Sequence, residues 1–196
     1  MIVCQRVVCW PVRTSRARSK AVALARTPAR SDAQCHAVTL ADQDRGRWNR
    51  EAIAEGSRWL SRAVILSGGT AGLYQLQAHL AAAHSTATSW SETDWDRIIG
   101  LYDLLGSAGA NPVVALNRAV AVTERDGPST GWPHWRAIVG LELSHLGHAA
   151  LADNLRRLGR TAEAAGELET AASLAPTEGE RRLLLSRLLD VRPEPA

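Results

Sequence analysis

The sequence predicts an all-α fold, an array of about seven to eight antiparallel helices. Alanine and leucine dominate the apolar residues, whereas phenylalanine is absent and methionine occurs once. Alanine and leucine are strong helix formers, and small alanine side chains let neighbouring helices approach closely. Apolar residues recur every three or four positions over much of the chain, which is the period of an amphipathic helix.

Four helices are expected before residue 127. An apolar stripe that begins at Trp48 is ended by Gly68, because glycine readily adopts the conformation that follows a helix. Ser91 or Thr93 is expected to cap the third helix, and Pro112 suits the first turn of the fourth. The expected ranges are about 46–66, 71–84, 94–105 and 112–126.

The last third of the chain is predicted to form three further helices. They are expected at about 145–158, 161–174 and 177–190, with turns at Gly159 and Pro176. The stretch before them is less regular, because Trp132 and Trp135 bracket Pro133. A short helix is expected there at about 135–143.

Residues 145–178 match the pattern of a tetratricopeptide repeat (TPR), which is a pair of antiparallel helices. Ala164 is taken as the small residue early in the second helix, and the other landmarks then fall in register. Small residues in both helices let the pair touch, while larger ones wedge into the neighbouring pair. The expected packing positions are Ala152, Leu155, Gly159, Ala164, Leu168, Ala171 and Pro176.

The preceding pair, 94–126, is a degenerate version of this repeat. Asn111 stands where the repeat has a small residue, so the register is broken. We expect the helices of 46–84 to form an atypical cap stacked on the two TPR-like pairs. The predicted architecture is therefore a TPR-like α-solenoid.

The charge is distributed unevenly. Residues 1–36 hold seven of the 23 basic residues and one of the 20 acidic residues, although the net charge of the chain is only +3. We expect a disordered or misassigned segment at 1–37, with a nucleic-acid-binding arm as the alternative. A TPR-like helical domain is expected at 38–192 and a tail at 193–196. No direct DNA binding is expected from residues 38–196.

Cysteine usage and hydropathy favour a cytoplasmic protein. The three cysteines, Cys4, Cys9 and Cys35, are odd in number and lack CxxC spacing, which disfavours a disulfide framework or a zinc site. No apolar run reaches the ~20 residues that a membrane-spanning helix needs. No membrane partner is expected.

Seven short strings, in this order, resemble the C-terminal extension of bacterial extracytoplasmic-function RNA polymerase sigma factors. The string at 112–122 is the most specific, and the resemblance covers about 40–190. The strings are LADQDRGRW at 40–48, IAEG at 53–56, YQLQ at 74–77, TDW at 93–95, LYDLL at 101–105, PVVALNRAVAV at 112–122 and LRRLGRTAEAA at 155–165.

This resemblance implies a role in transcription initiation through protein contacts rather than chemistry. In that family, the sigma regions bind core RNA polymerase and promoter DNA, and the TPR-like extension follows them. This chain has no room for sigma region 2 or for the helix-turn-helix of region 4, so promoter recognition does not carry over. The expected partners are the sigma regions or core RNA polymerase. A stand-alone TPR adaptor unrelated to transcription is the alternative.

No constellation in the sequence predicts catalysis. Gly68, Gly69 and Gly72 lack the Gly-Lys-Ser/Thr of a phosphate loop, and His145 and His148 lack a third metal ligand nearby. We therefore expect no catalytic residue, metal site, cofactor or small-molecule substrate, and the chain is interpreted as a non-enzymatic interaction domain.

Several residues are candidates for contact with a protein partner. Tyr74, Gln75 and Gln77 begin a helix, where the two glutamines can project into a groove. Asn117 and Arg118 lie in the most specific string. The acidic string at 42–45 is interpreted as a helix N-terminus, with a contact to sigma regions or polymerase as the alternative.

One binding mode is disfavoured by the repeat itself. TPR domains that clamp a terminal carboxylate place lysine and asparagine at the fifth and ninth repeat positions, which here are Ala149 and Asp153. Asp153 is expected to repel a carboxylate.

Overall fold

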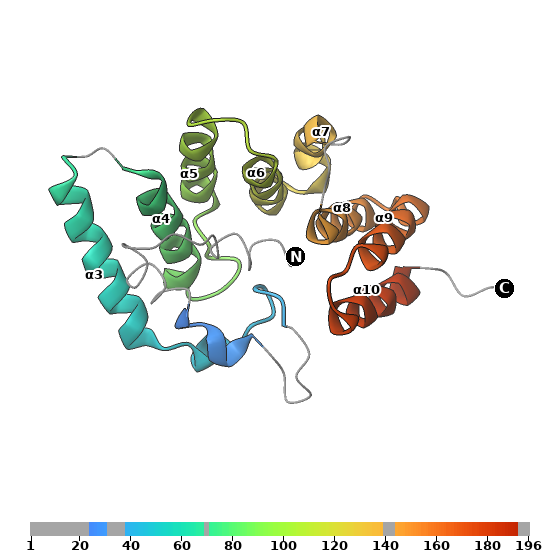
Figure 1. Ribbon diagram of the computed structural model, residues 1–196, viewed down its shortest axis with the longest axis horizontal. Helices are drawn as coiled ribbons and strands as arrows, with labels where there is room; N and C mark the ends of the chain where they lie inside the picture. The colour runs from blue at the N-terminus through green and yellow to red at the C-terminus, as the bar shows by residue number, and fades with distance from the viewer. Residues whose placement is uncertain (1–23, 31–37, 69–70, 139–143, 192–196) are drawn as a thin grey trace. The chain divides into compact units, whose positions relative to one another are not determined.

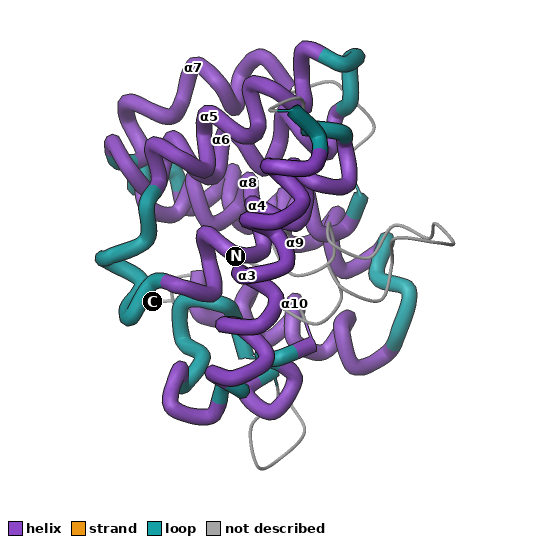
Figure 2. The backbone as a smooth tube through the Cα atoms, turned by 90° about the vertical axis from the view of Figure 1, so that its left-hand side faces the viewer, coloured by secondary structure: helices purple, strands orange, loops and turns teal. Residues whose placement is uncertain are grey.

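The computed structural model describes residues 24–30, 38–68, 71–138 and 144–191, and within these ranges it consists of helices and loops without a strand (Figure 2). The predicted all-α class of antiparallel helix pairs is confirmed. The described residues hold two short 3-10 helices and eight α-helices. These are η1 (Thr27–Ala29), η2 (Arg45–Arg47), α3 (Arg50–Leu66), α4 (Leu73–Thr86), α5 (Trp95–Ser107), α6 (Pro112–Asp126), α7 (Pro128–Ile138), α8 (His145–Arg157), α9 (Thr161–Ser173) and α10 (Glu178–Val191).

The chain divides into two compact units, with the boundary between Ala110 and Asn111. The N-terminal unit contains η1, η2 and α3–α5, and the C-terminal unit contains α6–α10 (Figure 1). The boundary falls inside the expected repeat of 94–126. This stretch therefore does not form one compact unit of its own.

Side-chain caps set the starts of the helices in the N-terminal unit. Asn49 accepts a hydrogen bond from the Ala52 amide, so α3 begins at Arg50 rather than at the expected residue 46. Asp94, not Ser91 or Thr93, caps α5 by accepting from the Arg97 amide. Each cap satisfies one of the main-chain donors that a helix start leaves without a partner.

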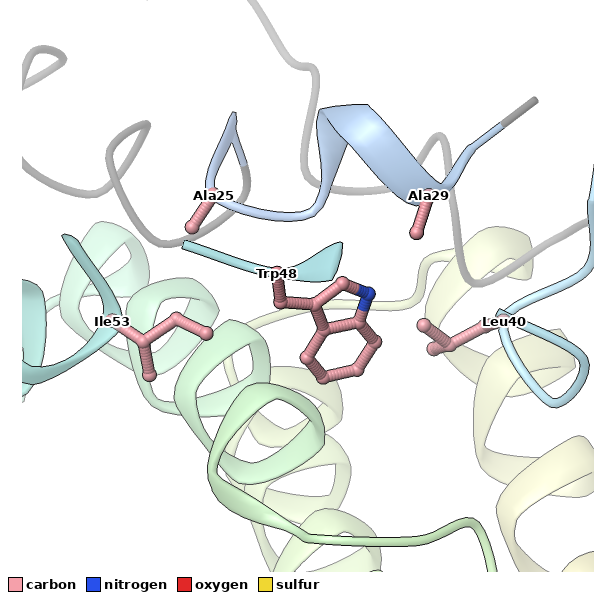
Figure 3. Packing of buried hydrophobic residues seen from close by; sticks show 5 residues of the cluster. All are labelled: Ala25, Ala29, Leu40, Trp48 and Ile53. Atoms are coloured by element: carbon pink, nitrogen blue, oxygen red, sulfur yellow. The ribbon is translucent and has the colours of Figure 1, made fainter. Parts of the chain in front are cut away.

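Trp48 lies at the centre of the N-terminal core (Figure 3). Its indole is surrounded by Ala25 and Ala29 around η1, by Leu40, and by Ile53 of α3, and all of these side chains are buried. The main chain is joined at the same place, because the Asn49 amide donates to the Ala25 carbonyl over 2.9 Å. Residues 24–30 are thus part of this core. The expected boundary at 37/38 does not separate them from the helical domain, and the rest of the basic segment at 1–23 and 31–37 lies outside the described residues.

Arg45 connects this core to the C-terminal end of α4. Its Nη1 donates to the carbonyl oxygens of His84 (3.1 Å) and Ala87 (2.7 Å), and its guanidinium lies 4.6 Å from the centre of the Trp48 ring. A cation near a helix C-terminus is stabilised by the carbonyl groups exposed there. The string at 42–45 leads into a short helix, as its structural interpretation expects, because Asp44 accepts from the Gly46 amide at the start of η2.

His84 is buried among aromatic rings. Its imidazole stacks on Trp90 at a centroid distance of 6.4 Å and meets the edge of Trp95 at 5.7 Å. Burial, together with the charges of Arg26 and Arg45, lowers the pKa of His84 to about 3. The histidine is therefore neutral at any pH at which the protein is normally handled.

The C-terminal unit begins with an asparagine cap and the helix expected at 112–126, followed by a short helix whose range differs from the expected one. Asn111 accepts from the Val113 amide (2.9 Å), which starts α6 at Pro112. Gly127, with φ of +88°, ends α6, and Pro128 then opens α7. The short helix expected at 135–143 in fact spans Pro128–Ile138, with Pro133 inside it. Residues 139–143 lie outside the described residues.

Helices α8, α9 and α10 form the most regular part of the unit and lie next to one another in chain order (Figure 1). Ala152, Leu155, Ala164, Leu168 and Ala171 are all buried at the contacts between them. Gly159, with φ of +75°, makes the turn between α8 and α9, a conformation that side chains with a Cβ adopt only under strain. Pro176 is exposed in the loop before α10.

No helix among the described residues is long and apolar enough to cross a membrane.

Replacing Ala164 by glutamate tests the packing of α9. We expect Ala164→Glu to lower the free energy of unfolding by about 3–5 kcal/mol, because it places an unpaired charge between packed helices. Ala162→Glu is the matched control, two residues away on the exposed face of the same helix. Urea unfolding followed by circular dichroism measures both variants. Equal stability of the two would contradict the packing of α9 described above.

The neutral, buried His84 makes the N-terminal unit less stable in mild acid. Below pH 6.5 the unfolded chain binds a proton at this histidine, whereas the folded chain does not until about pH 3. Between pH 7.5 and 5.5 we expect His84 to remove about 1.4 kcal/mol from the free energy of unfolding. His84→Phe keeps a ring packed against both tryptophans and should lack this loss. The measurement is urea unfolding by tryptophan fluorescence at both pH values, and an unchanged loss in the variant would assign the effect to other groups.

Candidate peptide-binding groove

An open cavity of about 230 Å³ lies between α8 and α10, with α9 as its floor. The apolar floor is formed by Leu168 of α9 together with Ala152 of α8 and Val191 of α10, and all three side chains are buried. The cavity is far larger than the ~10–15 Å³ that one water molecule requires. It is lined by Ala152, Asp153, Arg156, Leu168, Arg187, Asp190 and Val191.

Each wall of the groove carries one acid and one base. Asp153 and Arg156 are three residues apart on α8, and Arg187 and Asp190 are three apart on α10. Residues at this spacing share one face of a helix. The three-residue spacing on α8 and on α10 therefore brings four charged side chains to the rim of the groove.

Asp153 lies close to two arginines. Its Oδ1 is 3.1 Å from Arg156 Nη2 and 3.8 Å from Arg187 Nη2. The first distance is that of a charge-assisted hydrogen bond, whereas the second is too long for one. Both arginines offset part of the charge of Asp153, and the expectation that Asp153 would repel a carboxylate stays a prediction.

Arg187 is held in the groove with part of its guanidinium enclosed. Its Nη1 is buried and has no hydrogen-bond acceptor among the described residues. Burial is the main cause that lowers the pKa of Arg187; the charges of Asp153 and Asp190 act in the opposite direction, and Arg156 adds to the lowering. A guanidinium stays charged under these conditions, so a buried donor without an acceptor carries an energetic cost that a suitable anion could offset.

Sequence reasoning missed Arg187, although a signal was present. Arg187 interrupts an apolar run in α10 and stands three residues after Leu184 and four before Val191, both of which are buried. A charged residue at this spacing faces the packed side of a helix, and such residues are seldom placed there without a role.

Buried polar contacts hold α8 against α6 and α7. Trp135 Nε1 donates to Thr123 Oγ1 over 2.8 Å, and Thr123 Oγ1 lies 3.4 Å from Asn154 Oδ1 on α8. Arg157 of α8 forms an ion pair of 2.6 Å with Glu124 of α6 beside them. These contacts orient α8, and with it the wall that carries Asp153 and Arg156.

The structure places the predicted contact residues of the C-terminal unit away from the groove. Asn117 is only 3% exposed, and its amide donates to the Val113 carbonyl over 2.7 Å. It is therefore an interior residue of α6 that a partner does not reach. Arg118 is half-buried, with its Nη1 3.2 Å from His134 Nδ1 on α7.

Tyr74, Gln75 and Gln77 belong to α4 of the N-terminal unit. Tyr74 is 44% exposed, while the two glutamines are half-buried. The structure thus leaves Tyr74 open to a partner, and the role of these three residues stays a prediction. No group of three or more metal-ligating side chains gathers anywhere in the described part of the chain.

Comparison with known proteins finds uncharacterized relatives. The model of a family of unknown function, DUF6596, matches residues 21–64, the stretch that includes the Trp48 core. A protein of Rhizobium meliloti (strain 1021) described as uncharacterized is 36% identical over 173 residues, which cover 87% of this chain and 40% of that relative. The chain therefore spans less than half the length of this relative. No solved structure matches this chain.

Gly131 allows α7 to approach α6 closely enough for the Trp135 contact. A Cβ added at Gly131 would lie 2.3 Å from Thr123 Oγ1 and 3.0 Å from Thr123 Cα. We expect Gly131→Ala to lower the free energy of unfolding by about 1–3 kcal/mol, because the added methyl group overpacks this contact. Gly166→Ala is the control: no atom lies within 4 Å of its added Cβ, so this helical substitution should stabilise by up to ~1 kcal/mol. Thermal unfolding measures both, and a neutral Gly131→Ala would refute the close approach.

Proposed function

We propose that this chain is a non-enzymatic protein-interaction module that binds a peptide segment of its partner in the groove between α8 and α10. The observation that carries this proposal is the cavity itself, which combines an apolar floor with charged walls on two successive helices. Helical repeats build such concave surfaces by stacking, and extended or helical peptides bind in them. We propose a binding role and not a catalytic one for the four charged residues, because each wall carries one acid and one arginine.

We further propose that the partner belongs to transcription initiation, as sigma regions or core RNA polymerase. The support is the ordered set of strings that resembles the C-terminal extension of extracytoplasmic-function sigma factors. The longer relative accords with this proposal, because its similarity to this chain covers 40% of its own length. In such a protein the module would be one part of a larger polypeptide.

A capture experiment tests both proposals. The tagged full chain is incubated with bacterial core RNA polymerase, with and without sigma regions 2 and 4 supplied as a separate chain. The full chain is used because residues 24–30 belong to the folded core. We expect retention of the sigma regions or of polymerase. Retention of neither would refute the link to transcription.

Two arginine variants then test whether the groove is the binding surface. Arg156→Glu reverses a charge on the groove wall at a side chain that is 52% exposed. Arg181→Glu reverses one on α10 at a side chain that is 53% exposed and does not line the cavity. Each arginine pairs with an acid three residues earlier, so the two substitutions are closely matched. We expect Arg156→Glu to weaken capture about tenfold and Arg181→Glu to leave it within about twofold; equal effects would place binding elsewhere.

A further inference from the structure

We infer that Arg187 is a carboxylate-recognition residue of the groove, and that the bound segment presents an aspartate or glutamate side chain to it. This inference rests on the proposed function, because it names the partner chemistry of that same site. Arg187 is the most enclosed cation of the groove. Its side chain is 25% exposed, against 52% for Arg156.

An anion in the groove would supply hydrogen-bond acceptors that the guanidinium of Arg187 lacks among the described residues. Nη1 is enclosed without an acceptor in the described part of the chain, and Nη2 lies 3.8 Å from the nearest Asp153 oxygen, beyond hydrogen-bonding distance. The accessible remainder of the guanidinium lines the cavity. A carboxylate that enters the cavity can accept two parallel hydrogen bonds from a guanidinium edge, and partial desolvation strengthens such a contact.

The charges around Arg187 favour a single negative charge. Asp153 and Asp190 line the same cavity, so a phosphate group with nearly two negative charges would meet two like charges at short range. A carboxylate brings one charge, and Arg156 at the rim offsets part of the field of Asp153. The groove therefore suits an acidic peptide better than a phosphopeptide.

The floor of the groove favours a side-chain carboxylate over a chain terminus. Ala152, Leu168 and Val191 offer an apolar surface on which the methylene stem of a glutamate can lie while its carboxylate reaches Arg187. A terminal carboxylate is attached directly to the main chain and has no such stem. Burial of apolar stem atoms and pairing of the carboxylate thus act at the same place.

Side-chain NMR of the full-length protein tests this directly. The arginine Nε–Hε signals are assigned and titrated with N-acetyl-glutamate N-methylamide, and with the neutral N-acetyl-glutamine N-methylamide as its isostere. We expect the Arg187 signal to shift and saturate with the glutamate probe and to stay unchanged with the glutamine probe. No shift with the glutamate probe, or equal shifts with both, would overturn the inference.

Two further probes test whether Arg187 prefers a side-chain carboxylate to a terminal carboxylate or a phosphate. N-acetyl-glycine carries a terminal carboxylate, and N-acetyl-phosphoserine N-methylamide carries a phosphate. We expect both to bind more weakly than the glutamate probe. Tighter binding of the first would reassign the site to a chain terminus, and tighter binding of the second to a phosphopeptide; either result overturns the proposal as stated.

Arg187→Gln and Arg182→Gln complete the test. Both lie on α10, but Arg182 is exposed and pairs with Glu178 away from the cavity. We expect the glutamate probe to bind at least about tenfold more weakly to Arg187→Gln, because glutamine lacks the charge and the paired donors of the guanidinium, and to bind unchanged to Arg182→Gln. If Arg187→Gln does not fold, the titration of the unmodified protein still decides the question.

The outcome also separates this inference from the proposed function. Undiminished capture of sigma regions or polymerase by Arg187→Gln would overturn the role of Arg187 and leave the interaction module in place. Binding of the glutamate probe at Arg187 without any capture would keep the carboxylate site and overturn the proposed partner.

Discussion

The close approach of α8, α9 and α10 is the constraint on which the C-terminal unit depends. Ala152, Ala164 and Ala171 are buried where these helices meet, and each contributes only a methyl group to the space between them. Helix packing distance depends on the side chains at the contact. Because the helices lie this close, α9 can serve as the floor of a groove whose walls are α8 and α10. A larger residue at Ala152 would fill space that the groove now occupies, and larger residues at Ala164 or Ala171 would force the packed helices apart.

The N-terminal unit is organised by a different principle. A single tryptophan, Trp48, is surrounded by short segments and helix ends rather than by long helix faces. Arg45 satisfies main-chain carbonyl groups at the end of α4 and packs over the same ring. Such a core depends on specific polar contacts as well as on buried apolar area, so single substitutions within it have large effects. The family match at 21–64 falls on this arrangement.

How well the sequence predicted the structure depended on how local the signal was. Helices α8–α10 were placed to within one residue, because alanine spacing and the turns at Gly159 and Pro176 act within one or two turns. The range of α7 was wrong, since Pro133 usually interrupts a helix and here is accommodated inside one. Residues 24–30 showed no periodicity, and only their partners in the folded core, Leu40 and Trp48, explain their burial. Contacts of this kind depend on residues far along the chain, which a local pattern does not contain.

The same reasoning applies to the candidate site. Asn117 lies in the most specific string of the sequence, yet it is an interior residue of α6, because a distinctive string also arises from packing. Arg187 lies in an ordinary leucine-rich stretch, and only the fold shows that it faces α8 across the groove. In this chain, a residue in a distinctive string therefore need not lie in the groove, and a residue in the groove need not lie in a distinctive string.

The packing of residues 24–30 onto Trp48 also bears on how this domain can be exchanged between genes. The main chain of this segment is hydrogen-bonded to the rest of the core at two points, Asn49 N to Ala25 O and Val38 N to Arg30 O, each over 2.9 Å. A recombination joint at the apparent end of the basic segment would cut through both connections and uncover the indole. The smallest portion that a gene fusion could transfer intact therefore begins before Leu24. A fusion joint to a domain on the N-terminal side should accordingly lie upstream of η1.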